Sequence, residues 1–133
     1  NVDGIPYMDG GLADSIPIEY ALEKGNDKIV VVLTRNPGYR KKRALKATEQ
    51  LYKRAYKKYP NLVRAIMTRN AVYNRQMKLI EKLEEEGKIF VIRPLIPTVS
   101  RMEKDYDKLQ HFYMHGNRLM KKEYQGLLEY LNE

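Results

Sequence analysis

The sequence predicts an α/β fold with a mainly parallel sheet and a long C-terminal helix. Two short runs rich in β-branched and aromatic residues, 28–34 and 89–92, have the composition of strands. Segments with apolar residues every three or four positions lie around them, which is the spacing of helices, and the last 29 residues keep it throughout. An order of strand, helix and strand favours parallel pairing, because the crossover returns the second strand in the same direction.

Length and composition predict one folded domain over residues 1–133. Of the 133 residues, 43% are hydrophobic and 32% charged, a balance that supports a buried core. The absence of cysteine excludes disulfides, thiolate metal sites and a cysteine nucleophile. The longest apolar runs, such as Ile29–Leu33, are too short to cross a bilayer. We expect a cytoplasmic protein that contacts membranes only at their surface, although a chain beginning with Asn1 shows no targeting segment to read.

The N-terminal elements are predicted as a strand, a short helix and a second strand. The apolar stretch 4–8 ends at a glycine turn, so Asp9 is expected at the end of a strand. Ser15, Pro17 and Gly25 give the start and stop signals of a helix between them. The continuous apolar run 28–34 is typical of a strand covered by helices on both faces.

The remaining elements are mostly helices. After a turn at 36–38, apolar spacing predicts a helix over about 42–58 and a longer one from Leu62 to a glycine stop at Gly87. A strand over 89–92 follows, and the terminal helix then completes the fold. Its expected core-facing positions are Tyr106, Leu109, Tyr113, Gly116, Leu119 or Met120, Tyr124, Leu127 and Leu131.

Charge is divided unevenly along the chain. Residues 1–34 hold six acidic and two basic side chains, whereas residues 35–78 hold fourteen basic side chains and only one acid, Glu49. The rest is nearly neutral, so an anionic partner is expected to meet the middle block. Its densest part is Arg40, Lys41, Lys42 and Arg43, which we interpret as a candidate anionic-surface site. The alternative interpretation is an ordinary solvated helix face.

Few residues have the pattern of a reactive site. Asp9-Gly10-Gly11 places a carboxylate before flexible backbone, which suits a general base but also an ordinary turn. His111 and His115 lie four residues apart on one helix face, but no third ligand is evident, so we expect neither a metal nor another cofactor. Ser15 and Ser100 lack the flanking glycines of a nucleophile elbow, and Ser15 is interpreted as a helix cap. The chain alone therefore has no complete catalytic set.

Several ordered blocks resemble the C-terminal half of bacterial patatin-like phospholipases. They cover nearly the whole chain and include the segments 7–18, 27–35, 38–41, 59–62, 87–94 and 100–105. The resemblance implies a three-layer α/β/α fold in which this chain is the C-terminal part of a single catalytic domain. It also implies a lipid acyl hydrolase with a dyad of serine and aspartate.

Only the aspartate of that dyad maps onto this chain, at Asp9. The resemblance implies that Asp9 deprotonates the serine and then protonates the leaving alcohol, while Gly10 and Gly11 form the active-site loop. The serine and the oxyanion loop belong to an upstream half that these residues lack, so the fragment is expected to be inactive alone. Ser15 stands where many members of the family have Asn.

Three functions follow as alternatives. The first is hydrolysis of a lipid or ester substrate, with the basic block held at an anionic membrane surface. The second is a basic module that binds nucleic acid or an anionic surface without catalysis, because Tyr52, Tyr56 and Tyr59 alternate with basic residues. No nucleic-acid motif accompanies them, so no specific nucleic acid is expected as a partner. The third is a scaffold that has lost its active site.

Overall fold

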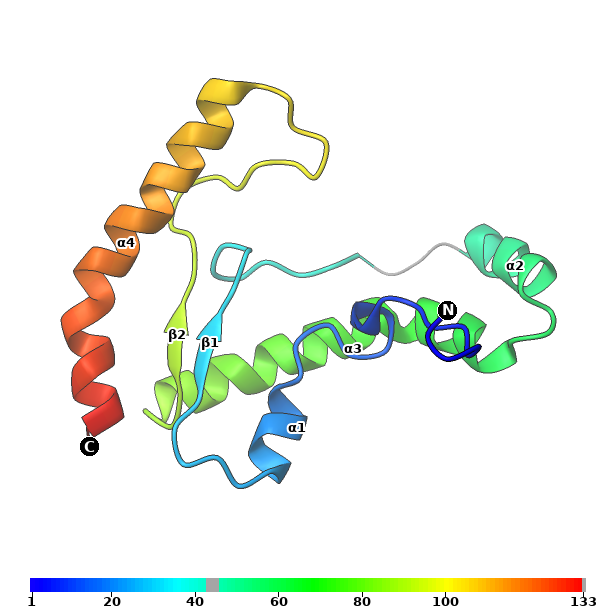
Figure 1. Ribbon diagram of the computed structural model, residues 1–133, viewed down its shortest axis with the longest axis horizontal. Helices are drawn as coiled ribbons and strands as arrows, with labels where there is room; N and C mark the ends of the chain where they lie inside the picture. Colours follow the sequence, from blue (N-terminus) through cyan, green and yellow to red (C-terminus); the bar gives the residue numbers. More distant parts are fainter. Residues whose placement is uncertain (43–45, 133) are drawn as a thin grey trace. The chain divides into compact units, whose positions relative to one another are not determined.

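The computed structural model describes residues 1–42 and 46–132, and it has mixed α/β character (Figure 1). Its contacts divide the chain into two compact units. Unit 1 comprises Asn1–Lys24 and Arg40–Ile80, and unit 2 comprises Gly25–Tyr39 and Glu81–Glu133. None of the described helices is long and apolar enough to span a membrane.

Unit 1 is built around the first part of a long helix. It contains the 3₁₀ helix η1 (Gly10–Leu12), α1 (Ile18–Glu23), α2 (Lys46–Ala55) and α3 (Pro60–Glu85) as far as residue 80. Pro60 opens α3, where the missing N–H of proline costs no helical hydrogen bond. The buried core of the unit consists of Ile18, Val63, Tyr73, Gln76, Met77 and Ile80. Both predicted helices of this region are confirmed within the described residues, whereas Leu45 and the start of the first lie outside them.

The strand predicted before Asp9 is wrong. Residues 4–8 form no strand, and the start of the chain holds only an isolated bridge between Val2 and Ile5. Tyr7 and Met8 are 66% and 57% exposed. A strand needs a neighbour for its backbone groups, and the two described strands pair with each other instead. The following helix is confirmed but begins only at Ile18, after Pro17.

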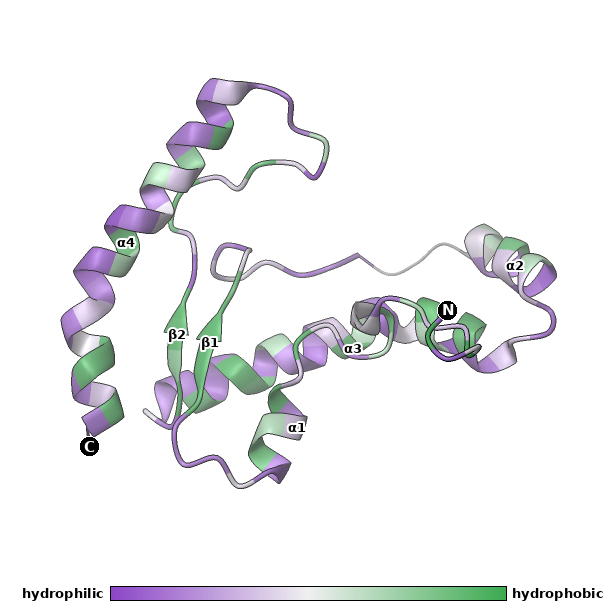
Figure 2. Ribbon diagram, viewed as in Figure 1, coloured by the Kyte–Doolittle hydropathy of each residue, from purple (hydrophilic) through white to green (hydrophobic). Residues whose placement is uncertain are grey.

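Unit 2 contains the sheet and the terminal helix. The strand β1 (Val30–Val32) pairs in parallel with β2 (Phe90–Ile92), as predicted. Both strands are hydrophobic along their length (Figure 2). The prediction that β1 is covered on both faces is wrong, because Val31 is buried while Val32 is 69% exposed.

The end of α3 confirms the predicted stop signal at Gly87. Gly87 has a φ of +67°, and the N–H of Lys88 donates to the carbonyl of Leu83 at 2.9 Å, which closes the helix. The helix α4 (Tyr106–Asn132) then contacts β2 (Figure 1). Asp105 caps α4 by accepting from the N–H groups of Asp107 and Lys108 at 3.1 and 3.2 Å.

A single tyrosine ties the three elements of unit 2 together. The Tyr130 hydroxyl accepts from the N–H of Ile29 at 2.9 Å. Its own proton faces the carbonyls of Lys88 at 3.1 Å and Ile29 at 3.3 Å. The Tyr130 ring also packs against Phe90, with 5.8 Å between ring centroids. The C-terminal helix is therefore fastened to the starts of both strands.

The face of α4 that the spacing predicted as buried is mostly exposed. The helix instead turns Gly126 and Tyr130 toward β2, while Tyr106 and Tyr113 remain 72% and 68% exposed. Two short strands cannot cover an apolar arc as wide as the one that α4 carries. We call this face the outer stripe. Its exposed members are Tyr106, Leu109, Tyr113, Gly116, Tyr124 and Leu131, and its half-buried members are Met120 and Leu127.

Candidate functional site

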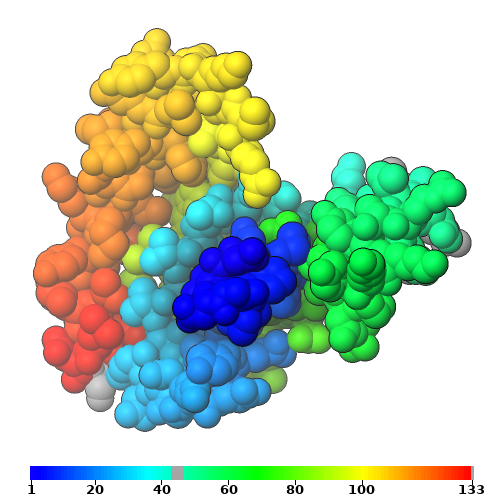
Figure 3. Space-filling model, turned by 45° about the vertical axis from the view of Figure 1, so that its right-hand side comes forward, coloured from blue at the N-terminus to red at the C-terminus, as the bar shows by residue number. Residues whose placement is uncertain are grey.

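Asp9 lies in an exposed turn of unit 1. It is the N-cap of η1, and its Oδ1 accepts from the N–H of Gly11 at 2.7 Å. The segment around it, dark blue in Figure 3, lies at the surface. The described residues provide no ion pair for this carboxylate. Asp9 is therefore open to an incoming group from solvent.

Gly11 lies in a tight position of this turn, whereas Gly10 does not. A Cβ atom at Gly11 would lie 3.1 Å from Oδ1 of Asp9, closer than ordinary contacts allow, and 3.9 Å from Nη2 of Arg69. A Cβ atom at Gly10 would meet nothing within 4 Å. Of the two glycines predicted to form the active-site loop, Gly11 therefore permits the close approach of the aspartate.

Arg69 of α3 stabilises the turn through a hydrogen bond to its backbone. Its Nε donates to the carbonyl of Gly11 at 2.8 Å, and the hydroxyl of Ser15 donates to the same oxygen at 2.9 Å. The interpretation of Ser15 as a helix cap is therefore wrong, because α1 begins three residues later without a side-chain cap. Ser15 fastens the glycine turn instead.

Gln76 of α3 holds the segment that follows the turn. Its side chain is 1% exposed, and its Nε2 donates to Oδ1 of Asp14 at 2.5 Å. Its Oε1 accepts from the N–H of Ile16 at 3.2 Å. Gln76 and Arg69 are seven residues apart, which places both on one face of the helix. The sequence analysis identified neither residue. The signal that could have suggested them is their spacing, which places two polar side chains on the same helix face as Tyr73. Such a face can bind another segment of the chain.

Within unit 1, the Asp9 carboxylate has no serine hydroxyl bonded to it. The Ser15 hydroxyl is engaged with Gly11, and the N–H of Glu103 donates to the Ser100 carbonyl in unit 2. Neither serine donates to Asp9. The geometry of unit 1 can therefore supply a carboxylate to an external hydroxyl group, but it cannot complete nucleophilic catalysis by itself.

Of the two histidines, His115 makes a hydrogen bond and a ring contact within unit 2. His115 accepts through Nε2 from the N–H of Leu95 at 3.1 Å, and its ring lies 6.5 Å from that of Phe112. His111 is exposed on the same helix. Within the described part of the chain, no three His, Asp or Glu side chains are grouped as metal ligands would be.

The backbone at the start of the basic block, residues 35–78, is hydrogen-bonded to side chains of α3. Asn74 exchanges hydrogen bonds with the N–H and carbonyl of Lys41, both at 2.9 Å, and Asn70 donates to the carbonyl of Lys42 at 2.7 Å. The Lys41 ammonium lies 4.0 Å from the centroid of the Tyr73 ring. Arg40 precedes these hydrogen-bonded residues, while Arg43 lies outside the described residues. The anionic-surface site predicted at these four cations stays a prediction.

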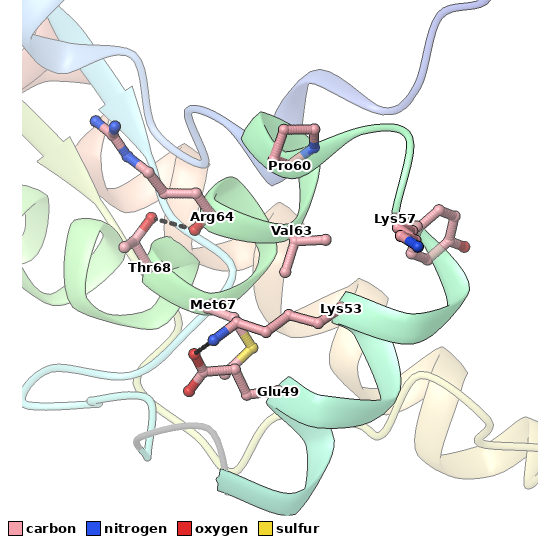
Figure 4. Close-up of a pocket in the computed structure, with 9 residues that line it drawn as sticks. Glu49, Lys53, Lys57, Pro60, Val63, Arg64, Met67 and Thr68 are labelled. Carbon is pink, nitrogen blue, oxygen red and sulfur yellow. Dashed lines mark hydrogen bonds and ion pairs between the residues drawn. The ribbon is translucent and has the colours of Figure 1, made fainter.

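A groove of about 480 Å³ separates α2 from α3 in unit 1. Figure 4 shows Val63 and Met67 of α3 facing Lys53 of α2 across it, with Lys57 at the loop end. Lys53 pairs with Glu49 at 2.7 Å. Arg64 also contributes to the lining. The groove thus combines an apolar floor with several cations from the middle block.

Comparison with known proteins gives one family. A family model described as a domain of unknown function, DUF6363, matches residues 59–132, more than half of the chain. The matched stretch contains α3, β2 and α4, but not the turn of Asp9. No curated protein and no solved structure matches the chain.

Proposed function

The chain belongs to the DUF6363 family, and we propose that it is the C-terminal part of a patatin-like serine acyl hydrolase that acts on lipid or ester substrates. In this proposal Asp9 is the acidic member of a dyad with serine. The nucleophilic serine and the oxyanion donors come from a preceding half of the same catalytic domain. The protein is then a cytoplasmic enzyme that meets its substrate at the surface of a membrane.

One observation carries the proposal, namely the way in which Asp9 is presented. Its carboxylate is exposed, yet the turn beneath it is held by Arg69 and Ser15 through a single carbonyl. The buried Gln76 anchors the next residues. A catalytic base needs this combination of access and fixed position, whereas a simple surface turn needs no anchors.

The chemistry assigned to Asp9 is proton transfer in both directions. As the serine hydroxyl attacks the ester carbonyl carbon, its proton passes to the Asp9 carboxylate and a new C–O bond forms. The carbon then loses the alcohol, which takes the proton from Asp9. Water attacks the acyl-serine in the second half, gives a proton to Asp9 and releases the carboxylic acid, while the serine oxygen recovers that proton. No metal or other cofactor is required for these steps.

The test compares ester hydrolysis by the complete parent protein before and after Asp9→Asn. We expect a loss of roughly a hundredfold or more in kcat, because the amide keeps the shape but accepts no proton. Asp3→Asn is the matched control, since it removes one carboxylate from a neighbouring exposed position. Equal loss in both variants, or none in either, would show that Asp9 is a turn residue only.

The chain of 133 residues alone is expected to hydrolyse no ester, because the Ser15 hydroxyl donates to the Gly11 carbonyl and Ser100 lacks the flanking glycines of a nucleophile elbow. The measurement is turnover of a chromogenic ester by protein purified to homogeneity. Activity that persists after Ser15→Ala and Ser100→Ala are combined would contradict the assignment of an external nucleophile.

The groove between α2 and α3 favours a second function, binding of an anionic surface without catalysis. Co-sedimentation with phosphatidylserine vesicles is expected to weaken about fivefold in Lys57→Gln, since each basic residue near such a surface adds about 1 kcal/mol. Lys121→Gln on α4 is the control for loss of charge. Binding that salt leaves unchanged, or retention of random RNA in a gel shift without vesicle binding, would refute this function.

A further inference from the structure

The outer stripe of α4 is an apolar surface that unit 2 leaves mostly exposed. Tyr124 and Leu131 are 54% and 46% exposed, in addition to the tyrosines named above. The opposite side of the helix is already occupied, since a Cβ atom at Gly126 would lie only 3.7 Å from the Phe90 ring and the N–H of Leu95 donates to His115. Contiguous apolar area of this kind marks a surface that binds another molecule.

The spacing of the outer stripe is nearly the same in both directions, and two of its four pairs join residues of the same type. Counting outward from the midpoint between Arg118 and Leu119, Tyr113 corresponds to Tyr124 and Tyr106 to Leu131. The other two correspondences, which hold to within one residue, are Leu109 with Leu127 and Gly116 with Met120. Such symmetry matches an identical helix that runs antiparallel, because a two-fold axis places each position against its counterpart. A different partner would not require it.

The shape of the outer stripe is also consistent with an identical helix that packs against it antiparallel. A shallow hollow of about 480 Å³ lies between Leu109, Tyr113 and Met120, with Gly116 at its base. A Cβ atom at Gly116 would meet nothing within 4 Å. In the antiparallel arrangement, Met120 of a second copy lies opposite this glycine, and its flexible side chain suits an irregular hollow.

The area indicates a weak to moderate interface. At roughly 200 Å² for each aromatic side chain, the three exposed tyrosines present about 400 Å². A standard interface buries about 800 Å² on each partner. The leucines, Met120 and the polar flanks add to the tyrosines, so the association is expected to depend on concentration in the micromolar range.

We propose that the outer stripe is a self-association surface on which two copies of the chain pack their α4 helices antiparallel about a two-fold axis near Arg118. The stacking of Tyr113 on Tyr124 occurs twice in this dimer, as does the insertion of Met120 over Gly116. This proposal is independent of the hydrolase function, because it uses no residue of the Asp9 turn.

The first experiment is sedimentation velocity over a range of concentrations. We expect a reversible dimer that Tyr113→Glu converts to monomer, while Tyr7→Glu has no effect. The two tyrosines are matched, since they are 68% and 66% exposed and Tyr7 lies in unit 1. A wild-type chain that stays monomeric at every concentration overturns the proposal. So does a dimer that Val32→Lys abolishes but Tyr113→Glu does not, which would indicate pairing through the edge of the sheet.

A second experiment determines the direction of the helices. The chain has no cysteine, so single cysteines can be introduced without interference. Asn117→Cys, near the two-fold axis, is expected to cross-link between copies with a short bis-maleimide. Tyr106→Cys is not, because its counterpart lies about 38 Å away along the helix axis. Cross-linking of both variants would indicate parallel helices, and cross-linking of neither would place the interface elsewhere; either result overturns the proposal.

Discussion

Gly11 and Gly10 are adjacent residues for which the structure predicts opposite sensitivities. Gly11→Ala brings a methyl group to 3.1 Å from Oδ1 of Asp9 and displaces the carboxylate by a few tenths of an ångström or more. Gly10→Ala meets open space. In the parent protein we expect ester hydrolysis to fall about tenfold or more in the first variant and to stay unchanged in the second, since small misplacements are costly in catalysis. A reversed order would contradict the geometry of the turn.

Gln76 gives a prediction about stability rather than activity. Gln76→Leu keeps the volume but leaves the Asp14 carboxylate and the Ile16 N–H without their partner. We expect a loss of about 1 to 3 kcal/mol in the free energy of unfolding, measured by urea titration. Arg75→Gln is the control, because its ion pair with Glu19 is exposed and is worth at most about 1 kcal/mol. Equal effects would mean that the buried bridge is not specific.

The residue scale also marks a limit of reading the sequence. Asp9 and Gly11 could be predicted as a turn because the signal is local. Arg69 and Gln76 could not, since they lie 58 and 62 residues away from the groups that they bind. Their seven-residue spacing could suggest a shared face of α3, but not which groups that face binds. The assignment of Asp9 as a catalytic base stays a prediction.

Among the elements, the start of α4 is expected to depend on pH. The backbone N–H of Lys108 donates to Asp105 and lowers the pKa of its carboxyl group below the ordinary value, with help from the Lys108 side chain. Because the pKa is lower in the folded state, the stabilisation is present above the ordinary Asp range near 4 and is lost as pH falls through the lowered value.

The measurement for this helix start is an NMR titration of the amides of Asp107 and Lys108 in acid. We expect their chemical shifts to move with an apparent pKa below that of an unstructured Asp. Asp105→Asn retains an acceptor for capping but removes the titrating group. If the same transition persists in that variant, another carboxylate causes it.

The ends of elements could be predicted where one residue strongly favours a single backbone conformation. Gly87 was predicted to close a helix and does so, whereas α3 begins at Pro60, two residues before its predicted start. The strand before Asp9 and the two-sided burial of β1 failed for a different reason. Each depends on neighbouring strands, which the local pattern of apolar residues cannot provide. The outer stripe of α4 failed for the same reason. The periodicity of its apolar residues predicts which of them share a helix face, but not which neighbouring element covers that face.

For the whole molecule, the two units make a testable prediction about cooperativity. Tyr130→Phe leaves the buried N–H of Ile29 without an acceptor and removes the donor to the strand carbonyls. We expect a loss of about 1 to 3 kcal/mol, seen as faster hydrogen exchange in β1 and β2. Amides of α3 within residues 60–80 serve as the internal control, since they belong to unit 1. A uniform change across both units would show that they unfold together.

At this scale, the mixed α/β class, the parallel pairing and the long terminal helix are confirmed. The three-layer arrangement stays a prediction, as does the description of the chain as part of one catalytic domain. Layers are defined by contacts between elements that are distant in sequence. Such contacts depend on three-dimensional packing that no short window of residues encodes.

The fastening of β1 by Tyr130 has a consequence for biosynthesis. The two partners of this bond are 101 residues apart. A ribosome that adds roughly 5 to 20 residues per second needs roughly 5 to 20 s to travel between them. During that time β1 has been synthesised but the tyrosine that binds its start has not. Nascent chains that stall before Tyr130 should therefore be the species that chaperones and proteases capture.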